Sequence, residues 1–221
     1  METVFIIIIL ILSIVVHEVA HGSVAYTLGD PTAKYAGRLT LNPIKHLDMV
    51  GSFLVPFFLL IMNSPFLLGW AKPVPINPYN FTDQKYGQLK VSLAGPMSNF
   101  ALAILFGIAG RFLPLEPGVR EGVGSAFPAM IESGFWGQVF FLFLFIVFIN
   151  TLLGIFNLIP IPPLDGSHIL FTFFPSLEYK AKVFFSRLGF IGMALLIFLF
   201  IWLFPIIFYF VEGIFRVIAG I

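Results

Sequence analysis

Four long stretches of the sequence contain no Asp, Glu, Lys or Arg. They cover residues 49–71, 91–110, 133–164 and 188–211. About 20 helical residues cross the hydrocarbon core of a bilayer, so each stretch is long enough to span it. Only 10% of the 221 residues are charged, whereas a soluble domain carries about 25%. These features predict a multi-pass integral membrane protein and exclude a soluble globule.

The first apolar segment covers residues 4–16 and is interrupted only by Ser13. Glu2 is the only charge before it and no small-residue cleavage site follows, so we interpret it as a retained helix rather than a signal peptide. The expected fold class is an all-α polytopic membrane protein of about four to six transmembrane helices, in a single membrane-embedded domain over residues 1–221. After the first helix, spanning helices are expected at residues 88–110, 135–158 and 188–212.

The basic residues predict the topology, because loops rich in Lys and Arg tend to stay in the cytoplasm. Nine of the twelve lie in residues 30–48, 72–90 and 178–187. If these segments are cytoplasmic, the N-terminus lies outside and residues 49–71 must begin and end on the same side of the membrane. Pro56 and the turn-like Asn63-Ser64-Pro65 favour a re-entrant hairpin there. An ordinary spanning helix with a proline kink is the alternative.

Two segments flanking this hairpin have a partly alternating pattern of polar and apolar residues. They are residues 38–41 and 71–76, and the pattern suits short membrane-associated β-strands.

The most specific chemical pattern is His17-Glu18-Val19-Ala20-His21, at the end of the first apolar segment. Residues four apart lie on one face of a helix, so both imidazoles can bind one zinc ion. Glu18 lies close enough to reach a water on that ion and act as general base, as in metalloproteases. The alternative is a polar cluster that joins two helices. Because the chain has no cysteine, a zinc site must use histidine, carboxylate and water.

Catalytic zinc generally has three protein ligands, and Asp165 is the best candidate for the third. It follows Pro160, Pro162 and Pro163, which cannot continue a helix, so the chain must unwind before it. Gly166 then allows close approach of the backbone to substrate or metal. The alternative makes Asp165 the N-cap of a short helix over residues 166–174, and both roles could hold.

Three motifs in order resemble the site-2 protease family of intramembrane zinc metalloproteases: HEVAHG at 17–22, AGPMSNF at 94–100 and FNLIPIPPLDG at 156–166. The chain is similar to the compact branch without a PDZ or nucleotide-sensing domain. The resemblance implies zinc bound by His17, His21 and Asp165, with Glu18 as base. It also implies that Asn157 holds substrate or stabilises the oxyanion, that Pro96 and Asn99 shape the helix facing the site, and that an edge strand near residues 36–42 pairs with substrate.

Several polar residues have two interpretations. For Asn99 and Asn150, an interhelical hydrogen bond is at least as good an explanation as a role in substrate binding. His46 lies in a basic loop and is interpreted as an interfacial residue, with substrate gating as the alternative. His168 lies three residues after Asp165 and could contact the site or only a neighbouring helix.

The expected function is hydrolysis, with one catalytic Zn²⁺, of peptide bonds within or near transmembrane segments of membrane-protein substrates. Asn99, Asn157 and Gly166 are assigned to substrate binding. The expected setting is the cell membrane of a prokaryote, with the active site in the cytoplasmic half and lipid as neighbour. No basic block or phosphate loop suggests nucleic acid or nucleotide. The alternatives are a divalent-metal transporter that uses the same three side chains and a non-catalytic membrane scaffold.

Overall fold

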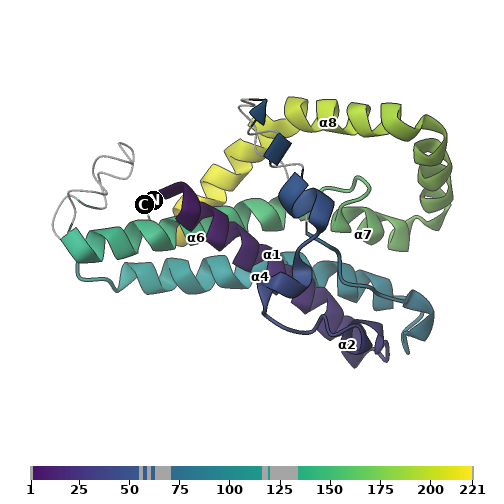
Figure 1. Ribbon diagram of the computed structural model, residues 1–221, viewed down its shortest axis with the longest axis horizontal. Helices are drawn as coiled ribbons and strands as arrows, with labels where there is room; N and C mark the ends of the chain where they lie inside the picture. Colours follow the sequence, from purple (N-terminus) through teal and green to yellow (C-terminus); the bar gives the residue numbers. More distant parts are fainter. Residues whose placement is uncertain are drawn as a thin grey trace. The chain divides into compact units, whose positions relative to one another are not determined.

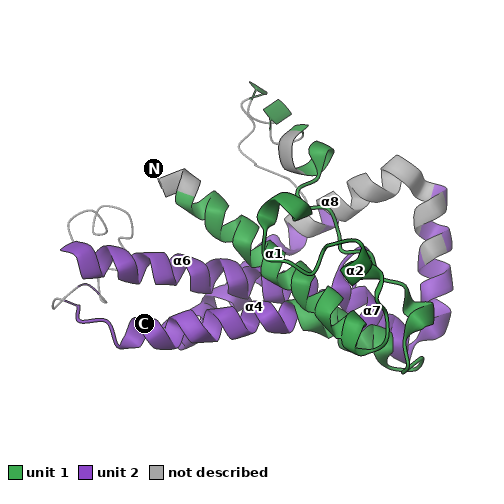
Figure 2. Cartoon of the chain, turned by 60° about the horizontal axis from the view of Figure 1, so that its bottom comes forward, with its two compact units in different colours: residues 1–95 green, residues 96–221 purple. Residues whose placement is uncertain are grey.

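The computed structural model describes residues 2–54, 57–58, 61–62, 71–115, 119 and 134–220. The chain divides into two compact units, residues 1–95 and residues 96–221, which Figure 2 draws in green and purple. The boundary falls inside helix α4 (Gly87–Arg111), directly before Pro96. Each unit is described separately below.

The first unit begins with helix α1 (Glu2–Thr27; Figure 1). The HEVAH motif lies in the second half of this helix. The helix ends where Gly29 adopts a φ of 101°, which glycine tolerates best. Asp30 N then donates to Ala25 O at 2.9 Å and Gly29 N to Tyr26 O at 3.1 Å, the paired bonds of a Schellman motif. Short elements follow: α2 (Thr32–Tyr35), η1 (Pro43–His46), the π-helix η2 (Met49–Leu54) and η3 (Pro78–Asn80).

A segment that we call the strap, residues 71–82, runs along the second half of α1. Thr82 N donates to Leu28 O at 2.7 Å at one end of this contact, and Val74 N donates to Glu18 Oε2 at 2.7 Å nearer the other. Apolar packing supports the same arrangement: a buried cluster joins α1, the strap and α4 through Ala25, Phe81 and Val91.

Asp30 is buried and provides the strap with a further anchor. Its Oδ2 accepts from Asn77 N at 2.7 Å and its Oδ1 from Asn80 Nδ2 at 2.8 Å, while Thr32 donates to Oδ1 from both its backbone and its hydroxyl group. Burial alone would raise the pKa of Asp30, but these hydrogen bonds favour the carboxylate and the net pKa is lowered.

The predicted strands are not found. Residues 36–42 and 71–77 are all described, and none of them is assigned to a strand. Pro73 and Pro75 have no N–H with which to donate to a ladder. Instead, the Arg38 guanidinium bonds the backbone carbonyls of Lys45 and Lys72. A side chain therefore joins these segments where a strand ladder was expected.

The second unit holds the rest of α4, followed by α6 (Gly134–Asn157), α7 (Asp165–Phe173) and α8 (Pro175–Ala219). α4 and α6 lie side by side (Figure 1) and are joined by a hydrogen bond of 2.9 Å from Asn99 Nδ2 to Asn150 Oδ1, both fully buried. α6 packs on α8 through a buried cluster of Phe140, Phe141, Leu144 and Ala219.

Four helices of the described part are long and apolar enough to cross a membrane. Their spans are Phe5–Thr27, Gly87–Arg111, Gly134–Asn157 and Trp202–Ala219. The helical fold and the multi-pass membrane class are thus confirmed, and α8 extends beyond the predicted 188–212 at both ends. The hairpin predicted within 49–71 lies largely outside the described residues, because Pro56 and Asn63-Ser64-Pro65 are not among them.

Candidate metal centre and active site

The two histidines of the motif lie on one face of α1, as their spacing predicts. The Nε2 atoms of His17 and His21 are 2.9 Å apart, and the rings meet edge to face with centroids 4.5 Å apart. Both side chains are buried. Two nitrogens bound to one tetrahedral zinc at about 2.0–2.1 Å would be about 3.3 Å apart, so a small rotation of either ring gives ligand geometry.

The hydrogen bond of the His21 Nδ1 atom indicates which tautomer this ring adopts. His21 Nδ1 lies 2.7 Å from Val91 O on α4. A carbonyl oxygen only accepts hydrogen bonds, so Nδ1 carries the hydrogen and Nε2 is the acceptor nitrogen that faces His17 Nε2. Metal-binding histidines are typically held in this way, with the other ring nitrogen bonded to a carbonyl or carboxylate.

Space in front of the two nitrogens exists because residue 95 is glycine. A Cβ at Gly95 would lie 2.4 Å from His21 Nε2 and 2.5 Å from His17 Nε2. A side chain at this position would therefore fill the space in front of both nitrogens. With glycine here, the two imidazole nitrogens are a donor set that fits a zinc ion.

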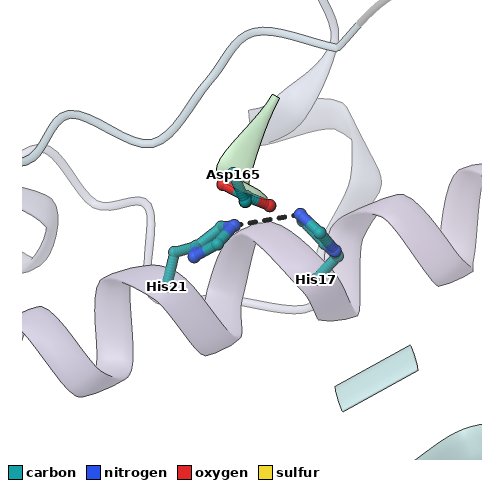
Figure 3. Close-up of side chains that lie close together, drawn as sticks. All are labelled: His17, His21 and Asp165. Atoms are coloured by element: carbon teal, nitrogen blue, oxygen red, sulfur yellow. Dashed lines mark hydrogen bonds between the residues drawn. The ribbon is translucent and has the colours of Figure 1, made fainter. Parts of the chain in front are cut away.

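Asp165 is the first residue of α7, after the unwound segment that the prolines predicted. The ligand atoms of His17, His21 and Asp165 all lie within 4.8 Å of one another (Figure 3). The N-cap residue of α7 is Leu164 and no side chain caps the helix. The alternative that made Asp165 the N-cap is therefore wrong.

Glu18 is half-buried, and one of its oxygens is held by the strap. Oε2 accepts the Val74 N–H at 2.7 Å. A carboxylate has two oxygens, so this bond fixes the orientation of the group and leaves Oε1 for a second partner.

The other candidate residues have structural roles in the second unit. Asn157 ends α6, where its Nδ2 donates one of its two hydrogens to Leu153 O at 3.0 Å. Gly166 allows α7 to begin against the preceding loop, because a Cβ there would lie 2.2 Å from Leu158 O. For Asn99 and Asn150, the observed bond matches the interhelical interpretation.

The two remaining histidines lie in different settings. His46 is 1% exposed, and its Nε2 lies 2.9 Å from Thr40 O. His168 is half-buried in α7 and meets the Phe171 ring edge to face.

Sequence reasoning missed two groups of the site. Gly95 lies in the AGPMSNF motif, but only Pro96 and Asn99 of that motif were given roles. A glycine in an apolar helix that must pass close to a histidine pair could have indicated it. The Val74 N–H could not have been found, because a backbone donor is the same at every residue except proline.

The chain matches peptidase family M50 over residues 78–200, a range that contains Asp165 but not the histidine pair. A Bacillus subtilis protein, provisionally named zinc metalloprotease YwhC, is 41% identical over 166 residues, which cover 75% of this chain and 67% of that protein. Relatives in Mycolicibacterium smegmatis and Mycobacterium tuberculosis, provisionally named zinc metalloprotease Rip2, are 30% and 31% identical over 156 residues. The chain spans about half the length of those two, 52% in each case. No solved structure matches the chain. The chain belongs to peptidase family M50, the site-2 protease family of membrane-embedded zinc metalloproteases.

Proposed function

We propose that this chain is an intramembrane metalloprotease that hydrolyses peptide bonds within or near transmembrane segments of membrane proteins. One observation carries the proposal: the His17 and His21 Nε2 atoms converge on the space beside Gly95, and the carboxylate of Glu18 follows His17 directly. Family membership supports the peptidase class. The four apolar helices support a site at membrane depth.

His17, His21 and Asp165 would hold the metal ion. The donor set suits zinc, which binds imidazole nitrogen and carboxylate oxygen and keeps one position open in catalytic sites. When bound there, zinc polarises the scissile carbonyl and lowers the pKa of a coordinated water toward about 7.

Glu18 is the proposed general base. With Oε2 held by Val74 N–H, Oε1 accepts a proton from the attacking water. The water oxygen adds to the carbonyl carbon, and Glu18 then delivers its proton to the amine nitrogen as the C–N bond breaks. The same carboxylate thus serves as base and then as acid.

Asn157 is proposed to donate its second amide hydrogen to the oxyanion or to the substrate backbone. We assign Asn99 and Gly166 to substrate binding through the helix and loop that they shape, beyond the packing described above. A transmembrane substrate has its backbone amides bonded within its own helix, so it must unwind locally before attack.

The proposed setting is the cytoplasmic membrane of a prokaryote, with the site in the cytoplasmic half. Nine of the twelve basic residues lie in the segments that this topology leaves inside, and the curated relatives described above are bacterial. The histidines lie in the second half of α1, which this topology directs toward the cytoplasm.

The test compares wild type with Glu18→Gln in detergent, using a model single-helix substrate. We expect Glu18→Gln to keep its zinc and to lose cleavage by at least 10²-fold, because general-base catalysis contributes about 10²–10⁴. Near wild-type cleavage would refute the assignment of the base. Proteoliposomes test the rivals: zinc flux without proteolysis indicates a transporter, and neither flux nor chelator-sensitive cleavage indicates a scaffold.

A further inference from the structure

Arg38 places a cation inside the first unit. Its side chain is only 7% exposed, and its partners are backbone carbonyls: Nη1 donates to Lys45 O, and Nη2 donates to Lys72 O at 2.5 Å and to Pro73 O at 3.4 Å. Burying a charge is costly unless hydrogen bonds compensate for it. Its Nε is buried with no hydrogen-bond partner among the described residues. Packing alone therefore does not explain why a charged side chain with this Nε donor is buried here.

Two of the carbonyls that Arg38 bonds, Lys72 O and Pro73 O, belong to the strap and directly precede the Val74 N–H that holds the base. Pro73 O and Val74 N–H are parts of one planar peptide unit, and in a trans peptide they point in opposite directions. Arg38 approaches the oxygen of this unit, and Glu18 Oε2 accepts its N–H at 2.7 Å. The Arg38 guanidinium and the Glu18 carboxylate therefore bind opposite edges of the same peptide unit, its oxygen and its N–H.

The other end of the arrangement is fixed by η1, whose last residue, His46, is buried. Lys72 N donates to His46 O at 2.9 Å, and Arg38 Nη1 bonds Lys45 O next to it. One guanidinium thus joins residues 45 and 72–73, which its several fixed donors can do and a single ammonium group does less well.

We propose that Arg38 is a positioning residue for the catalytic base: it orients the 73–74 peptide so that the Val74 N–H fixes the Glu18 carboxylate. This inference rests on the proposed function of Glu18. Small misplacements of a catalytic group can cost about 10²-fold in rate, so Arg38 should affect kcat without contacting substrate or metal.

The experiment measures cleavage kinetics, zinc content and amide exchange in the full-length protein. Arg38→Gln should lower kcat about 10- to 100-fold with KM changed less than about threefold and zinc content unchanged. Arg38→Lys should lose most of the same activity. In protein with isotope-labelled valine, the Val74 amide should exchange about tenfold faster in both variants. Lys45→Gln is the matched control, since it removes an exposed charge from the same loop but keeps the carbonyl.

A second variant covers the case in which Arg38→Gln does not fold. Val74→Pro deletes the N–H and leaves Arg38 in place, so its kcat should fall by a similar factor, and the double variant should show no further loss. Additive losses, an effect on KM alone, or unchanged Val74 exchange would overturn the inference. Failure of the proposed function has a different outcome: wild type would show no chelator-sensitive cleavage, while the exchange measurement would still report on the strap.

Discussion

Replacing Gly95 with alanine should weaken metal binding while leaving the fold intact. The new Cβ would lie 2.4 Å from His21 Nε2 and 2.5 Å from His17 Nε2. An ordinary contact begins at 3.4 Å, so the imidazoles have to retreat by about 1 Å. Zinc–ligand distances tolerate about 0.2 Å, and the displacement is about five times larger.

The expected changes in melting temperature and zinc affinity depend on which atoms must move to make room for the new Cβ. The atoms in the way are the ends of two side chains, so the fold can adapt by turning the rings, and alanine is the better helix former by about 1 kcal/mol. The melting temperature of metal-free protein should therefore change by no more than about 2 °C. Zinc affinity should fall by at least about 10- to 100-fold, the loss that follows when metal ligands are misoriented.

The assay is zinc competition against a chromophoric chelator in detergent, with cleavage of a model substrate measured in parallel. Gly213→Ala is the matched control. It makes the same substitution in α8, where a Cβ meets nothing within 4 Å. Wild-type zinc affinity in Gly95→Ala would refute the reasoning, because the nitrogens would then not share the space beside this glycine.

Three further predictions concern other parts of the chain. Asn99→Ala should destabilise the protein by about 1–2 kcal/mol, because it removes the partner of the fully buried Asn150 amide. In thermal unfolding, the Asn99→Ala/Asn150→Ala double variant should lose less stability than the sum of the losses in the two single variants. The pKa of Asp30 is lowered in the folded protein. Its carboxylate therefore stabilises the fold above the unfolded pKa of about 3.9, and this stability is lost as pH falls through the folded pKa. The melting temperature of wild type should fall more steeply below about pH 4 than that of Asp30→Asn. Asn157→Ala should lower kcat about 10²–10³-fold if its amide serves the oxyanion, and an unchanged kcat would limit Asn157 to its bond with Leu153.

Most of the helical framework could be predicted because each spanning helix needs a long apolar stretch. The same holds for the histidine pair, since the four-residue spacing alone puts both rings on one face of α1. The unwound chain before Asp165 followed from the three prolines, which cannot donate within a helix. These features depend on residue type and local spacing, and a sequence displays both directly.

The remaining features depend on backbone groups, which carry no residue-specific signal. Arg38 was counted among the charges that set topology and was placed in the predicted strand 38–41, but its partners are the backbone carbonyls of Lys45 and Lys72. The pattern in residues 71–76 suggested a strand, whereas its prolines leave a segment bonded mainly through Val74, Lys72 and their distant acceptors. His46 was assigned to the interface because its loop is basic, and only tertiary packing buries it.

The most direct test of the account is zinc-edge X-ray absorption on protein purified without chelator. We predict one zinc per chain, with two imidazole nitrogens at about 2.0–2.1 Å and a carboxylate oxygen at about 2.0–2.2 Å. Asp165→Ala should lose that oxygen or the metal itself. A metal-free protein that still cleaves its substrate, or a zinc shell without imidazole, would contradict the account.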